Sequence, residues 1–250
     1  MDKAAVSGSE SLHRSPLMFM RAHATEPLQD VEAIDAFAIA PWEQSLRQMV
    51  DIPLDRDTAI SRCQSAHGTE LQMFTDGSMK NGRVGYGIVV WADGCTKTEI
   101  RRTIGTDDMV NVYIAELGAI MEAVEWAETM LRFSTGTWGV TIYSDNMSAL
   151  QAVTKPRHQS GQSLIRQIAK TMWKSQARGK RICLAWVPGH AGIPGNEAAD
   201  RLAATTTAPD SVVTTPLCFR GRFRSVVMGS LKRIQPAAQS SLQWLSLIHI

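Results

Sequence analysis

Hydrophobic and polar positions take up a regular pattern at about residue 70 and keep it to about residue 207. Alternation predicts a strand over 71–75 that runs into a turn at Asp76, and two further apolar runs predict strands over 84–91 and 98–104. Turn-forming residues, many of them glycines, separate the three runs. We therefore expect three consecutive strands that pair antiparallel.

The clearest helical pattern covers residues 112–131, where apolar side chains recur every three or four positions. Glu116 lies on the edge of this apolar stripe, whereas Glu122 and Glu125 lie on the far side. A helix that needed glutamates only for solubility would place all of them away from the stripe. Glu116 is therefore a candidate for a site.

Strands and helices alternate in the second half of the pattern. Strands are expected over 138–143 and 181–187, and helices over 147–153, 163–177 and 196–205, the last with Asn196 as its N-cap. Strands joined through helices pair in parallel by right-handed crossovers. The sequence thus predicts an α/β fold with a five-stranded mixed sheet, three antiparallel strands followed by parallel β-α units, flanked by helices.

The flanking segments carry weaker patterns. Residues 1–69 are interrupted by prolines and are expected to be a largely irregular linker or connector, with a short helix over 43–50. The regular pattern defines a domain over 70–207, and residues 208–250 form a basic tail. The last six residues, 245–250, translate CTG TCT CTT ATA CAC ATC, the end of a sequencing adaptor, and we hypothesise that they are an assembly artefact.

Composition narrows the class of protein. The chain has 250 residues with 44% hydrophobic, enough for a substantial core, and its net charge of +2 does not by itself indicate a nucleic-acid partner. The 4 cysteines are scattered without metal-ligand spacing, which favours reduced thiols in an intracellular protein, nuclear or cytoplasmic. No run approaches the ~20 apolar residues of a membrane span, so no membrane partner is expected.

Four carboxylates are predicted to meet at one edge of the sheet. Asp76 and Asp145 each follow a strand, and Glu116 and Asp200 lie on helices that reach the same edge. Each acid also has an ordinary alternative, as a turn residue, a helix cap or a solvated helix residue. Oxygen-only ligands select Mg²⁺ or Mn²⁺, and two such ions ~3.5–4 Å apart support phosphoryl displacement.

Four motifs carry a resemblance to a known family. They are Thr75-Asp76-Gly77-Ser78, Ala115-Glu116-Leu117, Tyr143-Ser144-Asp145-Asn146, and Gly189-His190-Ala191-Gly192 leading to Asn196-Glu197-Ala198-Ala199-Asp200. In this order the chain resembles type 1 ribonuclease H, and most closely the domain found in non-LTR retrotransposon reverse transcriptases. The resemblance implies an RNase H-like fold and an endonuclease that cuts the RNA strand of RNA–DNA hybrids.

The resemblance also implies roles for individual residues. Asp76, Glu116, Asp145 and Asp200 would hold two Mg²⁺ ions, which Mn²⁺ could replace, and His190 would assist proton transfer or product release. Backbone groups near Gly77 and Ser78, together with Asn146, would contact the hybrid. An attached reverse transcriptase domain is expected in the parent polyprotein, and the isolated domain is expected to be a monomer.

One departure from the family affects how substrate would be held. Some cellular members insert a basic protrusion where this chain has only residues 154–162. Grip on the hybrid would then depend on a few cations, which are Lys155, Arg157, Lys170, Lys174 and Arg178. The alternative is that these cations form an ordinary solvated helix face.

Two other classes of protein remain open from the sequence. A decayed remnant that binds hybrids without cutting them is one, although all four acids and His190 are intact. A different nuclease or an integrase on the same fold is the other. Integrases end their acid set with a glutamate on the last helix, so the aspartate at position 200 argues against that class.

Overall fold

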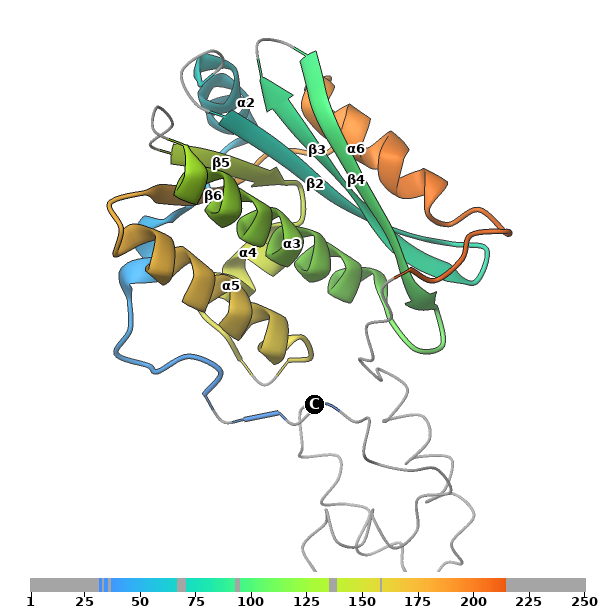
Figure 1. Cartoon of the computed structure of the whole chain (residues 1–250), viewed down its shortest axis with the longest axis horizontal. Coiled ribbons are helices and arrows are strands. Elements are labelled where there is room, and N and C mark those ends of the chain that lie inside the picture. The colour runs from blue at the N-terminus through green and yellow to red at the C-terminus, as the bar shows by residue number, and fades with distance from the viewer. Residues whose placement is uncertain are drawn as a thin grey trace, which may run out of the picture.

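A computed structural model describes residues 32, 34–35, 37–66, 71–92, 95–134, 139–157 and 159–214. Figure 1 shows a twisted six-stranded sheet with helices on both faces. The strand order is β1-β6-β5-β2-β3-β4, antiparallel between β2, β3 and β4 and parallel between the others. The α/β fold and the five expected strands are confirmed, and one short strand is added to them.

The antiparallel half consists of β2 (Leu71–Lys80), β3 (Arg83–Ala92) and β4 (Cys95–Thr106). Asn81 and Gly82, both with positive φ, make the two-residue turn between β2 and β3. The expectation that β2 ends before Asp76 is wrong, because β2 keeps pairing with β3 as far as Lys80. Its parallel pairing with β5 does end at Thr75, so Asp76 still lies at the carboxyl edge of the parallel strands.

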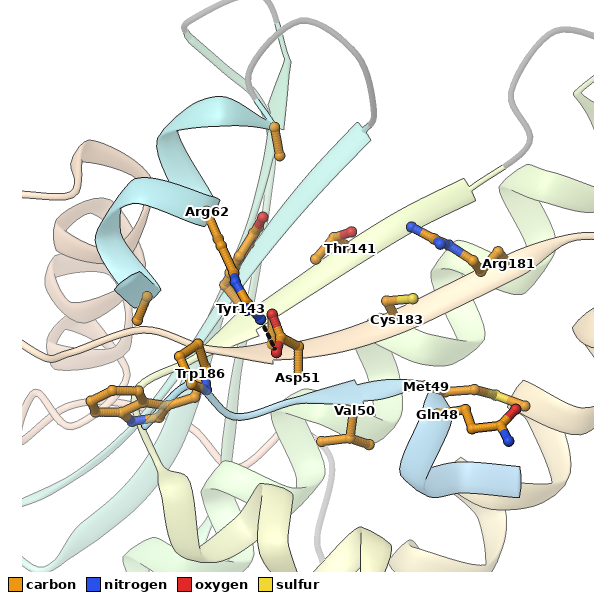
Figure 2. A pocket seen from close by; sticks show the side chains of 14 residues that line it. Gln48, Met49, Val50, Asp51, Arg62, Thr141, Tyr143, Arg181, Cys183 and Trp186 are labelled. Carbon is orange, nitrogen blue, oxygen red and sulfur yellow. Dashed lines mark hydrogen bonds and ion pairs between the residues drawn. The ribbon is translucent and has the colours of Figure 1, made fainter. Parts of the chain in front are cut away.

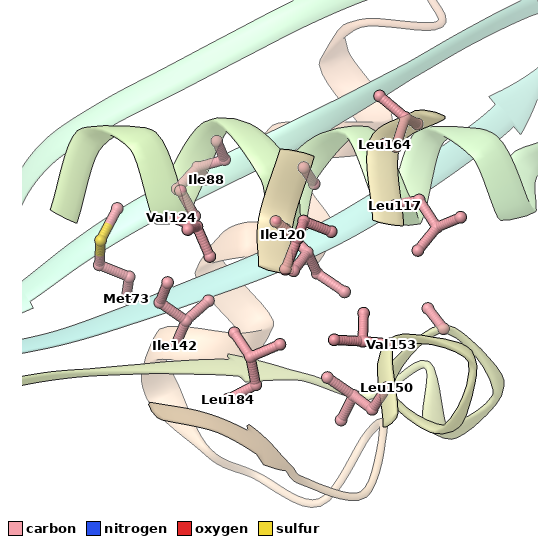
Figure 3. Close-up of a cluster of buried hydrophobic side chains, with 14 of the residues drawn as sticks. Met73, Ile88, Leu117, Ile120, Val124, Ile142, Leu150, Val153, Leu164 and Leu184 are labelled. Carbon is pink, nitrogen blue, oxygen red and sulfur yellow. The ribbon is translucent and has the colours of Figure 1, made fainter. Parts of the chain in front are cut away.

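The parallel half places β5 (Gly139–Ser144) and β6 (Arg181–Trp186) beside β2. The connecting helices are α3 (Val112–Phe133), α4 (Met147–Thr154) and α5 (Gln162–Gln176). Their apolar faces pack with the sheet into one core, of which Figure 3 shows the centre around Ile120 and Ile142. The helix α6 (Pro194–Thr205) packs on the opposite face with Phe74 and Val89.

The expected irregular connector is partly folded onto the domain. After a short 3-10 turn η2 (Ser45–Gln48), β1 (Val50–Asp51) pairs with β6, and α2 (Arg56–Ser65) follows, capped by Asp55. A two-residue strand and a weakly amphipathic helix leave no periodic signal, which is why the sequence pattern missed them. The helix expected over 43–50 is correspondingly shortened to η2.

The folded part of the connector encloses a cavity of about 460 Å³ against the sheet (Figure 2). At its rim Arg62 on α2 pairs with Asp51 on β1 at 2.6 Å. The described helices include none that is both long and apolar enough to cross a membrane. The basic tail beyond residue 214 and the final six residues lie outside the described part of the chain.

Candidate active site

Asp76 and Asp145 occupy neighbouring positions at the sheet edge. Thr75 and Ser144 are the last paired residues of the β2–β5 ladder, and each aspartate follows one of them. Asp76 is 8% exposed, and Asp145 is partly exposed. The indole Nε1 of Trp186, at the end of β6, donates to the backbone oxygen of Asp145 at 3.1 Å and fixes the chain where it leaves β5.

Glu116 reaches the same edge from α3. It is 5% exposed, and it packs against Gly77, where an added Cβ would lie 3.0 Å from the Glu116 backbone nitrogen and 3.1 Å from Cγ and Cδ. The backbone N–H of Gly77 and the side chain of Asn146 both donate to the Glu116 carboxylate. The amide oxygen of Asn146 also caps α4 by accepting from Ala149 N at 3.0 Å. Glycine at position 77 thus makes room for Glu116, and Asn146 holds it.

The carboxylates of Asp76, Glu116 and Asp145 converge, with one oxygen of each within 4.8 Å of the others. Burial, Asp145 and Asp200 raise the pKa of Asp76 to about 7. Burial and the neighbouring aspartates raise the pKa of Glu116 well above its usual range, and burial also raises that of Asp145. Such a group resists ionisation unless a cation neutralises it.

The residues present fit a hard divalent cation. Oxygen atoms alone converge, and Oε2 of Glu116 is buried with no hydrogen-bond partner among the described residues. An unpaired buried carboxylate oxygen is costly, whereas the same atom is a good ligand for Mg²⁺ or Mn²⁺. The prediction that Asp76, Glu116 and Asp145 form a metal-binding cluster therefore has a geometric basis.

Asp200 stands slightly apart from the other three acids. A carboxylate oxygen of Asp200 lies within 4.8 Å of ligand atoms of His190 and Glu197. His190 is in the loop after β6, and Glu197 is on α6. Asp200 remains close enough to raise the pKa values of Asp76 and Asp145. His190 is exposed and has a φ of 50°, which sets it at the surface of the glycine-rich loop. The five expected catalytic residues thus lie in one region, in two adjoining groups.

Two polar residues of α6 were missed as site residues. Asn196 is not the N-cap, because α6 begins at Pro194 and has Ile193 in the capping position. Its side chain is instead 2% exposed and donates to the Asp145 carboxylate. Glu197 joins His190 and Asp200. The spacing of Asn196 and Asp200, four residues apart on one helix, was a signal that could have placed both at the site.

The residues expected to contact nucleic acid differ in their surroundings. Gly77 and Ser78 lie beside the carboxylates on β2, and Asn146 is already engaged by Glu116 and α4. The side chains of Lys155 and Arg157 are exposed and make no ion pair with any described residue.

Two of the other proposed cations have partners within the protein. Lys174 and Arg178 both pair with the buried Glu128 of α3, the former at 3.3 Å. They therefore tie α5 to α3 rather than stand free for phosphate. The prediction that they grip the hybrid conflicts with these ion pairs.

Comparison with known proteins agrees with this geometry. The sequence model of the RNase H family matches residues 68–208, more than half of the chain. The chain belongs to the RNase H family. This membership makes it a ribonuclease H, an enzyme class that acts on RNA–DNA hybrids and generally depends on divalent metal ions.

Individual relatives match about half of the chain. Ribonuclease H of Verminephrobacter eiseniae is 28% identical over 147 residues, which span 54% of this chain and 88% of that protein. Ribonuclease H of a Polaromonas species is 29% identical over 148 residues, covering 54% and 86%. Among solved structures, RNase H1 of Halobacterium salinarum is 21% identical with a TM-score of 0.42, covering 57% of this chain and 99% of its own.

Proposed function

We propose that this protein cuts the RNA strand of RNA–DNA hybrids by two-metal-ion chemistry with Mg²⁺, as the ribonuclease H part of a retroelement reverse transcriptase. The observation that carries the proposal is the convergence of Asp76, Glu116 and Asp145, with Asp200 beside them. Four acids at the carboxyl edge of a ribonuclease H sheet are the ligands that such chemistry needs. Mn²⁺ would serve in place of Mg²⁺, since both prefer oxygen ligands.

Each protein group has a distinct task in this proposal. When bound, a pair of divalent cations would supply an activated water and stabilise the leaving 3′-oxygen. Asp76 and Asp145 would bind the ions from the sheet edge, and Glu116 would bind with the Oε2 atom that lacks a partner among the described residues. Gly77 and Ser78 present backbone groups to the RNA strand beside that site.

The polar neighbours orient the ligands. Asn146 and Asn196 fix the carboxylates of Glu116 and Asp145, so that both are in place before substrate arrives. His190 lies at the exposed end of the site, next to Asp200, where its imidazole would take or give a proton as product leaves. The exposed loop position suits a group that moves with substrate.

The retroelement context rests on the likeness of the four motifs to those of non-LTR retrotransposon domains. This chain lacks the basic protrusion with which some cellular members bind the hybrid. A reverse transcriptase domain in the same polyprotein would supply additional contacts to the hybrid. We place the protein inside the cell, in nucleus or cytoplasm, and expect the ribonuclease domain to be a monomer. A catalytically decayed remnant is the alternative.

Cleavage of a labelled hybrid tests the proposal. The full chain with Mg²⁺ should cut the RNA strand, and Asp76→Asn and Asp145→Asn should abolish cutting. Asp57→Asn, which changes an exposed acid on α2, is the matched control and should cut as the parent does.

The other outcomes separate the alternatives. Magnesium-dependent stabilisation of the fold without cleavage would mean that the site assembles but needs its polymerase half to hold substrate. Neither cleavage nor a metal effect would favour the decayed remnant.

A further inference from the structure

The N-terminus of α5 is capped by a residue from far outside the family match. Gly161, the N-cap position of α5, has a φ of 89° and no side chain to accept from the helix. The carboxylate of Glu32 takes this role, accepting from Gly161 N at 2.8 Å and from Ser160 Oγ at 2.8 Å. A carboxylate there also complements the positive end of the helix. Glu32 therefore anchors an upstream segment on α5.

Asp35 fastens the same segment a second time. The buried side chain of Gln162 accepts from Asp35 N at 2.9 Å and donates to Asp35 O at 3.0 Å. The same amide nitrogen also donates to the backbone oxygen of Arg157 at 2.9 Å. Gln162 thus joins the upstream segment to the loop that carries Arg157. We call Glu32, Ile34, Asp35 and Phe37 the strap.

The strap borders a groove of about 970 Å³. Phe37, 68% exposed, lines the groove together with Tyr113, Lys155 and Arg157. None of the described residues that line it carries a carboxylate. The groove therefore combines an exposed aromatic ring with two cations that have no ion-pair partner among the described residues.

The groove lies near the active site along α3 and α4. Tyr113 precedes Glu116 by three residues on α3, and Ser148 follows Asp145 by three residues at the start of α4; both line the groove. Three residues are close to one helical turn, so the groove begins about one turn from the carboxylates.

We propose that the strap and this groove form a nucleic-acid-binding surface, in which Phe37 packs on a base or sugar and Lys155 and Arg157 contact phosphates of the bound hybrid. The inference rests on the proposed hybrid substrate. An exposed aromatic ring beside cations that have no ion-pair partner among the described residues matches the alternating apolar and anionic character of a nucleic-acid strand. The strap lies outside residues 68–208, so it adds a binding element to those that the family match covers.

Binding of the full chain to a labelled hybrid tests this surface, measured by fluorescence anisotropy in the absence of divalent metal. Phe37→Ala should raise Kd at least about fivefold, and in a separate cleavage assay with Mg²⁺ it should raise KM similarly with kcat unchanged. The matched control is Phe133→Ala, which removes a 75% exposed ring at the far end of α3 and should leave Kd unchanged. The double change Lys155→Ala and Arg157→Ala should make the slope of log K against log salt shallower by about 0.7–0.9 for each phosphate that is no longer neutralised.

Glu32→Gln tests the anchor itself. Loss of the charged cap should raise the hydrogen-exchange rates of the Gly161 and Ser163 amides and weaken hybrid binding in the same direction as Phe37→Ala. If the parent cleaves the hybrid and Phe37→Ala has the same Kd as the parent, the strap does not bind nucleic acid. The proposed function would be unaffected by that result.

The remaining outcomes also decide. If the parent does not cleave hybrid, single-stranded DNA binding that still depends on Phe37 would support the surface without the activity. Binding of an acidic peptide in preference to any nucleic acid, or no nucleic-acid binding at all, would overturn the inference.

Discussion

The side chain of Asn196 on α6 donates a hydrogen bond to the carboxylate of Asp145, across the sheet edge. Asn196 is 2% exposed, its Oδ1 has no partner among the described residues, and its side chain acts to lower the pKa of Asp145. The bond favours the ionised form of Asp145, which burial and Asp200 disfavour. Asn196 therefore prepares Asp145 to bind a cation.

Replacing this donor should weaken metal binding. In Asn196→Leu, Asp145 loses the donor, and we expect the Mg²⁺ concentration for half-maximal cleavage to rise about 10- to 100-fold. Gln176→Leu, which removes an exposed amide at the end of α5, is the control. An unchanged Mg²⁺ titration in Asn196→Leu would contradict the orienting role.

Stability of the metal-free protein should fall as pH rises. Burial, Asp145 and Asp200 raise the folded pKa of Asp76 from 3.8 to about 7. A raised acid pKa means that the native state binds the extra proton, so the free energy of unfolding declines between about pH 4 and pH 7. For this group alone the decline is about 4 kcal/mol, and Glu116 acts in the same direction.

Urea unfolding in EDTA at pH 5 and pH 8 measures this effect. Asp76→Asn should show a smaller loss of stability between the two pH values, because it cannot ionise. Added Mg²⁺ should stabilise the parent more at pH 8 than at pH 5. Equal pH dependence in parent and variant would show that Asp76 titrates normally.

Whether the sequence predicts a helix or strand depends on how many repeats of its hydrophobic pattern the element contains. The 22-residue helix α3 and the alternation in β2 and β3 extend over several repeats, so the sequence identified them and, through them, the mixed character of the sheet. The two-residue strand β1 has no repeat to detect, and its place is decided by pairing with β6, more than 130 positions away. Local signals cannot report such a partner.

The proximity of the four acids was predictable from the sequence, whereas the residues that support them were not. Asp76, Glu116, Asp145 and Asp200 follow from strand ends and motif order. Asn196 looked like a helix cap, because the sequence does not show that Pro194 starts the helix two residues earlier. No sequence signal pointed to Glu128, because its role depends on the ion pairs with Lys174 and Arg178 from another helix.

Gly77→Ala should displace Glu116 while the fold persists. A Cβ at position 77 would lie 3.0–3.1 Å from the backbone nitrogen and side-chain carbons of Glu116, so Glu116 would have to shift by a few tenths of an ångström. We expect cleavage to fall more than about tenfold and stability to fall by about 1–3 kcal/mol. Gly105→Ala is the control, because its Cβ would lie 3.2 Å from a side-chain carbon of Val110 and not beside the carboxylates. This change should lower stability but leave cleavage at saturating Mg²⁺ unchanged.

Stability and binding measurements should distinguish the cations that pair with Glu128 from those that line the groove. Lys174 and Arg178 neutralise Glu128, whose side chain is 8% exposed, so Glu128→Gln should lower the free energy of unfolding by about 1–3 kcal/mol. The same change should leave the Kd for hybrid within about twofold, because none of these groups faces the groove. Lys155→Ala should do the reverse, weakening hybrid binding at low salt with little change in stability. Urea unfolding and anisotropy on both variants decide between these assignments, and a loss of hybrid affinity in Glu128→Gln at unchanged stability would return Lys174 and Arg178 to the substrate.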